Sequence, residues 1–279
     1  MVNETIDYAQ QSPITRLTRH QHGLLDGLPR DPLSICASAQ NLVVSPQEAI
    51  AAGIPENRIK EQGVRPVRDL LAILTELWPE RLERWRPLEV RVVGTTRHSA
   101  VLACSMLRAQ GYATRVRCGY LAPISGKEPR THWTTEWWSE SDGRWIRMEF
   151  FPAISGSDRR SGQASIEFVT AGEAWQLCRS RSPGRSPIGL DIFGAGASAE
   201  ISADVVRDLA ALGKLEMLPT DAWGRMTAPQ SGLASAAYLN LIDVVASVCN
   251  RGDLSGIVRL RAGVDLAVPP HLVGTPVKA

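Results

Sequence analysis

A change in the apolar period at Gly111 restricts the fold more than any other feature of this sequence. Apolar residues recur at helical spacing from Thr96 to Gln110, and Gly111 suits the left-handed position that ends such a helix. Apolar and polar residues then alternate, as in strands, over three successive segments: 114–120, 132–138 and 145–151. One helix followed by three strands predicts an α+β core in which the helix packs on an antiparallel sheet.

The segments on either side of this core predict helices. Before it, apolar spacing predicts a helix over 68–78 that ends at Pro79, with shorter helices over 32–40 and 46–52. A polar, glycine-rich link over 155–162 follows the core. Three late helices are then expected: 171–179, opened by a capping box from Thr170 to Glu173; 203–214, capped by Ser202; and 234–249, the longest of the three.

The composition excludes several classes of partner. Lys and Arg number 31 against 29 Asp and Glu, so no basic excess favours nucleic acid. No apolar run approaches the roughly 20 residues of a membrane span, and the first residues lack the features of a secretory signal. We therefore expect a cytoplasmic protein with no nucleic-acid or membrane partner. Its low lysine content is typical of a GC-rich bacterial genome.

The five cysteines predict neither a disulfide framework nor a metal centre. They are widely separated, form no C-x-x-C pair and have apolar neighbours: Cys36, Cys104, Cys118, Cys178 and Cys249. We expect each to be a small buried residue in a reducing compartment. No set of side chains has recognised metal-ligand spacing, so no metal and no cofactor are expected.

Three segments together resemble the transglutaminase-like family, which shares the papain-like cysteine-enzyme architecture. They are GTTRHSAVLACSMLRAQGYATRVRCGY (94–120), THWTTEWW (131–138) and GRWIRMEF (143–150). In that family a G-x-C-R turn opens a helix ending in L-R-x-x-G. An H-x-W or H-W strand with Glu four residues on follows, and then a tryptophan strand ending in Asp. The phrases TAGEAW (170–175) and RDLAALGKLEMLP (207–219) resemble bacterial members.

The resemblance implies a transglutaminase-like or papain-like core flanked by mainly helical parts in one compact unit. We expect three parts: 1–87, mainly helical; 88–155, the core; and 156–279, mainly helical. The family mechanism needs a thiolate at the helix start, a histidine base and a carboxylate that orients the histidine. The matching positions here are Thr96, His132 and Glu149, so two of the three residues have changed.

Other residues in the matching motifs are expected to contact the substrate: Arg97, Trp133 and Glu136. Neither Cys104 nor Cys118 is placed to replace the missing cysteine, because Cys104 lies about 12 Å along the helix and Cys118 is on a strand. Thr96 itself is a weak nucleophile, because its hydroxyl has a far higher pKa than a thiol.

Structural roles are the alternative for the three residues at the matching positions. Thr96 could simply cap the helix, His132 could be a structural histidine, and Glu149 could be a solvated strand residue. The tryptophans of the core are more often sheet packing than a substrate wall. Three further histidines lack a partner pattern and are expected to face solvent: His20, His22 and His98.

Two registers are open for the last two strands. A hairpin centred between Glu140 and Ser141 sets His132 opposite Glu149, whereas a two-residue turn at Asp142-Gly143 sets Glu149 opposite Glu136. Both registers keep these side chains on one face of the sheet, and the family likeness favours the first.

These residues favour a repurposed transglutaminase-like enzyme acting on a small-molecule substrate. His132 is the acid/base, Glu149 orients it and Thr96 positions the substrate, in a cyclisation, condensation or acyl or amide chemistry of metabolite biosynthesis. A non-catalytic protein that binds a ligand or partner in the old cleft is one alternative. Residual acyl transfer by Thr96, or transfer removed by an engineered threonine, is another. Oligomeric state and substrate identity do not follow from the sequence.

Overall fold

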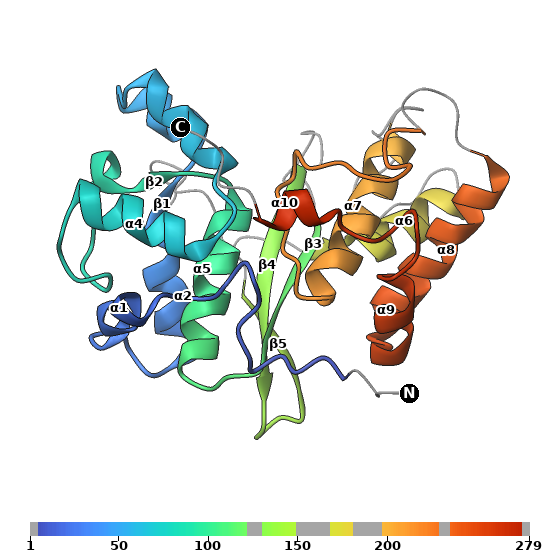
Figure 1. The fold of residues 1–279 in the computed structure, drawn as a ribbon, viewed down its shortest axis with the longest axis horizontal. Helices are drawn as coiled ribbons and strands as arrows, with labels where there is room; N and C mark the ends of the chain where they lie inside the picture. The colour runs from blue at the N-terminus through green and yellow to red at the C-terminus, as the bar shows by residue number, and fades with distance from the viewer. Residues whose placement is uncertain (1–4, 122–129, 149–167, 181–196, 229–234, 275–279) are drawn as a thin grey trace, which may run out of the picture.

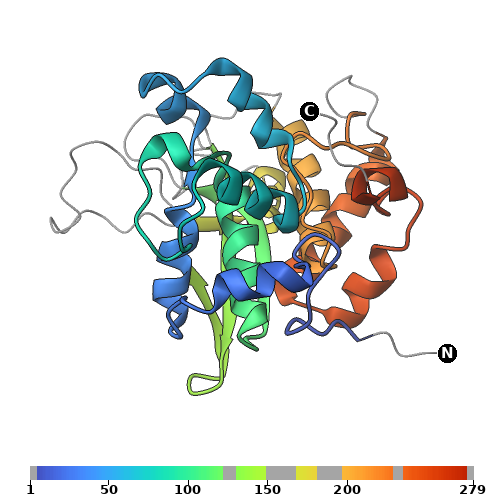
Figure 2. The same ribbon diagram turned by 60° about the vertical axis from the view of Figure 1, so that its left-hand side comes forward.

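The computed structural model describes residues 5–121, 130–148, 168–180, 197–228 and 235–274. A sheet lies in the middle, with the N-terminal helices on one side and the C-terminal helices on the other (Figure 1). The turned view shows helix α5 (Thr96–Ala109) running along the strands (Figure 2). No helix of the described ranges is both long and apolar enough to cross a membrane.

The N-terminal part is helical, as predicted. The helices expected over 32–40, 46–52 and 68–78 are observed to within one residue at each end. Asp31 and Ser45 cap the first two, and a proline occupies the first turn of each, where its missing N–H costs nothing. The elements are α1 Arg19–His22, η1 Gly23–Leu25, α2 Pro32–Gln40, α3 Pro46–Ala51, η2 Glu56–Gly63, α4 Val67–Leu77 and η3 Leu88–Val90.

Helix α5 confirms the helix predicted over 96–110. Gly111 follows it with φ +89°, the left-handed conformation that favours glycine at a helix end. Every residue from Arg97 to Arg108 is buried, because α2 packs on one side of α5 and the sheet on another. The polar side chains of this helix therefore need partners inside the protein.

Four antiparallel strands form the main sheet, in the order β5-β4-β3-β6. The three consecutive strands predicted from the period are confirmed, although 149–151 lie outside the described residues. The fourth strand has only three residues, too few to show a period in the sequence. The strands are β3 Thr114–Leu121, β4 Arg130–Ser139, β5 Arg144–Met148 and β6 Phe168–Thr170.

Strand β3 departs from the alternation expected for a half-exposed strand. All residues from Thr114 to Tyr120 are buried, because α5 and α7 (Ala197–Leu212) both pack against this strand. Its polar residues are therefore paired inside the protein. Arg117, for example, binds Asp208 of α7 through Nη2 at 2.8 Å.

A short parallel pair, β1 (Val43–Val44) with β2 (Val92–Val93), precedes α5. The N–H of Gly94 donates to the Val44 carbonyl at 2.9 Å, and the chain then turns directly into the helix. A Cβ added at Gly94 would lie 2.8 Å from Cγ of His98, so a side chain at this turn would clash.

The C-terminal helices agree with the prediction at two of three starts. The Thr170 capping box opens α6, and the helix predicted over 234–249 begins two residues later, after Ser235 as N-cap. Ser202 as a cap is wrong: α7 begins at Ala197, and the Ser202 hydroxyl donates to the Ala199 carbonyl within the helix. The link over 155–162 lies outside the described residues. The helices are α6 Ala171–Arg179, α7, α8 Ala236–Arg251, α9 Leu254–Leu260 and α10 Pro270–Gly274.

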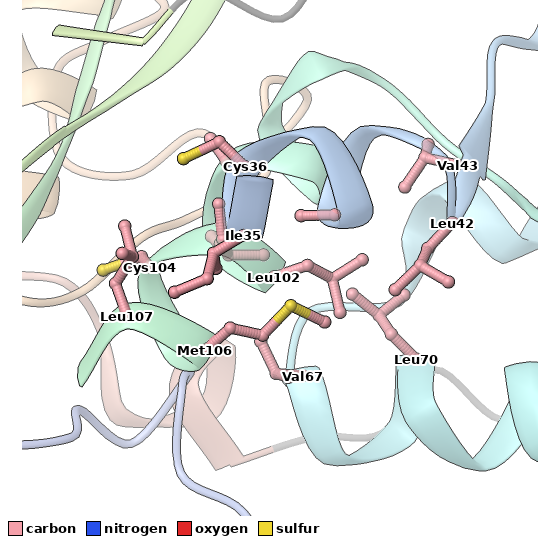
Figure 3. Close-up of a cluster of buried hydrophobic side chains, with 14 of the residues drawn as sticks. Ile35, Cys36, Leu42, Val43, Val67, Leu70, Leu102, Cys104, Met106 and Leu107 are labelled. Carbon is pink, nitrogen blue, oxygen red and sulfur yellow. The ribbon is translucent and has the colours of Figure 1, made fainter. Parts of the chain in front are cut away.

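Two large buried apolar clusters hold the helices to the sheet. The first joins α2, α4 and α5, where Ile35, Leu70 and Leu102 meet (Figure 3). The second joins the C-terminal helices, with Trp175 and Ile242 among its members. Each fully buried leucine or isoleucine side chain contributes about 1.5–3 kcal/mol to the free energy of folding.

Candidate active site

Thr96, which the resemblance places at the nucleophile position, lies at the start of α5. The N-cap is Thr95, so Thr96 is the first helical residue and a capping role for it is wrong. His98 is fully buried, which corrects its expected exposure, and its Nδ1 accepts the Thr95 N–H at 3.0 Å. Burial lowers the pKa of His98 to about 3 and keeps its ring neutral. His20 and His22 are exposed, as predicted.

The hydroxyl of Thr96 meets strand β4 beside His132. Its Oγ1 accepts the backbone N–H of Trp133 at 3.0 Å, and the side chain is partly exposed. The nitrogen of Trp133 is about 2.4 Å from the His132 Cα through two covalent bonds. The Thr96 oxygen therefore lies within about 5.5 Å of the His132 Cα. Helix and sheet thus bring these two positions together.

His132 is buried, with only 3% of its surface exposed. It lies opposite Gly119 of β3, and its ring meets the edge of Phe168 of β6 at a centroid distance of 6.0 Å. A Cβ on Gly119 would lie 2.1 Å from the Val169 carbonyl oxygen, so glycine allows β6 to approach this closely. Burial lowers the pKa of His132 to about 4, so its imidazole is neutral at pH 7.

Glu149, the expected orienting carboxylate, lies outside the described residues. The observed register differs from both expected ones: Glu136 of β4 pairs with Arg147 of β5, and Trp138 pairs with Trp145. A four-residue loop, with Gly143 at φ +60°, connects the strands in place of a two-residue turn. The loop length sets this register, which lies midway between the two alternatives.

Two of the expected substrate contacts, Arg97 and Trp133, are buried and have partners inside the protein. Arg97 has no exposed surface, and its guanidinium donates to the carbonyls of Arg65 and Glu216. Trp133 is 1% exposed and belongs to the apolar cluster on the α5 side. Both side chains thus lie between α5 and the elements that pack on it.

Glu136, the third expected contact, is the centre of a buried ion cluster. Its carboxylate accepts from Arg115 Nε at 2.8 Å and from Arg147 Nη2 at 2.8 Å, and Arg117 lies 3.9 Å away. Burial by itself raises the pKa of Glu136, but the three guanidiniums outweigh it and lower that pKa to about 2. Glu136 is therefore ionised and already paired.

No cysteine of the chain is activated. All five are free thiols; four are buried and Cys178 is half-buried, which corrects the expected burial of all five. Burial raises the pKa of Cys104 to about 12, and its Sγ lies 3.8 Å from the Thr114 carbonyl. Burial also raises the pKa of Cys118. A thiol becomes a nucleophile when its pKa falls, so neither replaces the missing cysteine.

Arg147 and Phe168, which the sequence did not single out, contact Glu136 and His132, respectively. The Arg147 guanidinium lies over the Phe168 ring, with its Cζ 4.7 Å from the centroid. Strand alternation could have placed Arg147 on the face of Glu149, because the two residues are separated by one position on a predicted strand. No local pattern in the sequence could have placed Phe168 beside His132, since its short strand pairs with β3 across a long stretch of sequence.

A family model of the transglutaminase-like superfamily matches residues 79–150. The chain therefore carries a transglutaminase-like core, in an α+β fold, as the motifs predicted. No curated protein and no solved structure matches the chain. Within the part of the chain described, no group of three or more His, Cys, Asp or Glu side chains is placed to hold a metal ion.

Proposed function

We propose that the chain is a transglutaminase-like enzyme in which His132 transfers protons on a small-molecule substrate that the Thr96 hydroxyl positions. One observation carries this proposal: the 3.0 Å hydrogen bond that places the partly exposed Thr96 hydroxyl at the helix start, beside the His132 backbone. Glu149, which lies outside the described residues, is assigned the orientation of the imidazole.

The neutral imidazole of His132 can accept a proton. Negative charge that develops on a substrate beside it stabilises the protonated ring, so its pKa rises as the reaction proceeds. A positioned base of this kind contributes about 10²–10⁴-fold in rate. Since no low-pKa thiol is at hand, we assign proton transfer rather than thioester chemistry.

The hydroxyl of Thr96 is suited to binding. Its oxygen already accepts the Trp133 N–H, and the hydroxyl donates no hydrogen bond to a described residue. The O–H can therefore donate to a substrate oxygen. We propose a cyclisation, a condensation, or acyl or amide chemistry in the biosynthesis of a small bacterial metabolite, in the cytoplasm. The free thiols agree with a reducing compartment.

The low pKa of His132 also favours a second function, ligand binding without turnover. General acid/base catalysis is most efficient when the pKa lies near the working pH, whereas that of His132 is about 4. A neutral imidazole can equally serve as a hydrogen-bonding group for a bound ligand or partner.

Turnover by variants separates these functions. The purified protein is screened by mass spectrometry against small amides, esters and thioesters, and His132→Ala and Thr96→Ala are then compared on any substrate found. The proposal expects at least about 100-fold lower kcat for His132→Ala. Thr96→Ala is expected to lose about 1–3 kcal/mol of substrate-binding free energy, seen mainly as a higher KM.

The exposed His20 offers the matched control, because His20→Ala removes an imidazole remote from the site. Unchanged turnover in His132→Ala would refute the proposal. An ester on Thr96 in substrate-treated protein would show covalent catalysis by the threonine instead. Ligand binding with no turnover, altered in affinity by both variants, would establish the second function.

A further inference from the structure

The described part of the ion cluster around Glu136 contains more guanidiniums than carboxylates. Among the described residues, its guanidiniums are those of Arg115, Arg117 and Arg147, and its carboxylates are those of Glu136 and Asp208. Asp208 binds Arg117 through both oxygens and also accepts the N–H of Cys118. One positive charge is therefore not balanced by a carboxylate of the cluster.

Arg147 is the member of this cluster that solvent reaches. Its side chain is 34% exposed, against 11% for Arg115 and 4% for Arg117. A small anion can therefore approach Arg147 without displacing the buried pairs.

The donors of Arg147 are only partly used. Nε and Nη2 both donate to Oε1 of Glu136, at 2.9 and 2.8 Å, and Nη1 donates to the Phe168 carbonyl at 3.3 Å. A guanidinium has five N–H groups, so two have no acceptor among the described residues, one on each terminal nitrogen. N–H groups on the two terminal nitrogens can pair with the two oxygens of a carboxylate.

Phe168 lies between this guanidinium and His132. Phe168 contacts both residues: its centroid is 4.7 Å from the Arg147 Cζ and 6.0 Å from the His132 ring centroid. Because these two separations bound the third, His132 and the guanidinium are at most about 11 Å apart. The residues Glu136 and His132 also share one face of β4.

We infer that Arg147 binds a carboxylate of the substrate, and that the site takes small carboxylic acids whose reacting group lies at most about 11 Å from the guanidinium. This inference rests on the proposed function for the identity of the reacting group, but carboxylate binding itself requires no turnover. Arg147 is then a specificity-determining residue, with Glu136 fixing the plane of its guanidinium.

Titration with succinate tests the inference. The ring signals of the five histidines are followed by NMR, and His132 is assigned by the loss of its signal in His132→Gln. Succinate is expected to shift the His132 signal saturably, at concentrations up to about 10 mM, whereas its neutral diamide is not. Arg147→Gln should lower the affinity for succinate at least about 10-fold, since it removes a charge-assisted pair of hydrogen bonds.

Two variants serve as controls. Arg144→Gln removes the same charge from the same strand, three residues earlier and on the opposite face, and should change the affinity less than about 2-fold. Arg147→Lys keeps the charge but lacks the paired donors, so its affinity for succinate should lie between those of the wild type and Arg147→Gln. Near-UV circular dichroism checks that each variant is folded, and Arg147→Lys decides the matter if Arg147→Gln is not.

The inference is overturned by any of three results: no saturable shift of the His132 signal with succinate, an equal shift with the diamide, or a loss of succinate affinity in Arg144→Gln as large as that in Arg147→Gln. Its failure differs from failure of the proposed function. Succinate binding that depends on Arg147 while His132→Ala retains turnover would remove only the acid/base role. Turnover that depends on His132 without succinate binding would remove only the carboxylate site.

Discussion

The backbone N–H of Trp133 donates to the Thr96 hydroxyl across 3.0 Å, and this bond connects the first residue of α5 to the residue directly after His132. Any side chain that replaces the hydroxyl meets the same donor, at the positive end of a 14-residue helix. Both effects stabilise an anion at this position.

We therefore expect Thr96→Cys to carry the most reactive thiol of the protein. The Trp133 N–H and the helix start should lower its pKa below the usual value of about 8.5. Iodoacetamide near neutral pH, followed by peptide mass spectrometry, should label position 96 ahead of the native cysteines. Of these, four are buried, and burial raises the pKa of the half-buried Cys178.

Thr75→Cys is the matched control for this experiment. Thr75 is also partly buried, but it lies two residues before the end of α4, where the helix dipole disfavours a thiolate. Equal labelling rates at positions 96 and 75 would mean that the start of α5 does not activate a thiol.

Local rules predicted the elements that position this site. The apolar period and Gly111 defined α5, and the capping box at Thr170 defined the start of α6, because these signals lie within a few residues of one another. The same rules failed for Ser202 and His98. A serine inside a helix can donate to its own backbone, and a histidine near a helix start is buried when the chain before it packs against the ring.

The register and the charge pairing depend on contacts distant in sequence. Glu136 was identified by its motif, but its partner Arg147 follows from the length of the hairpin loop, which Asp142-Gly143 alone does not fix. Phe168 reaches His132 only because β6 pairs with β3 after a long connection. Tertiary arrangements of this kind leave no periodic signal in one sequence.

Acidification should destabilise the protein through His132. Burial lowers its folded-state pKa to about 4, below the unfolded value of about 6.5, so the unfolded chain takes up the proton first as the pH falls. Stability present above pH 6.5 is thus lost between about pH 6.5 and 4. Urea unfolding at pH 7.5 and 4.5 should show that His132→Gln loses about 2–3 kcal/mol less than the wild type.

The exposed His22 provides the comparison, since His22→Gln should lose as much stability as the wild type over the same interval. His98 acts in the same direction as His132, because its pKa is lowered to about 3, and its contribution is common to all three proteins. An identical pH dependence in His132→Gln and the wild type would contradict a buried, neutral His132.

Gly119→Ala should weaken the pairing of β6 with β3. The added Cβ would lie 2.1 Å from the Val169 carbonyl oxygen, a backbone atom that cannot move aside without displacing the strand. We expect a loss of about 1–3 kcal/mol in urea unfolding. Gly23→Ala is the control: nothing lies within 4 Å of its Cβ position and its φ is −63°, so stability should not fall. Equal stabilities for the two variants would rule out the close approach of β6.

The buried pair of Arg108 and Glu216 should be the most sensitive ionic contact among those described. Both side chains have no exposed surface, and Arg108 Nη1 lies 3.2 Å from Glu216 Oε1 while the other oxygen accepts from Ser12 at 2.9 Å. Glu216→Gln leaves the guanidinium buried without its counter-charge, so we expect the free energy of unfolding in urea to fall by about 3–5 kcal/mol.

Asp265→Asn is the control for this variant. It removes an acid from a pair with Arg225 at 2.6 Å, where both side chains are partly exposed. Because water screens these charges, the free energy of unfolding should fall by less than about 1 kcal/mol. A loss in Glu216→Gln no larger than that in Asp265→Asn would mean that Arg108 is stabilised by the carbonyls around it, those of Tyr8 and Thr114, rather than by the carboxylate.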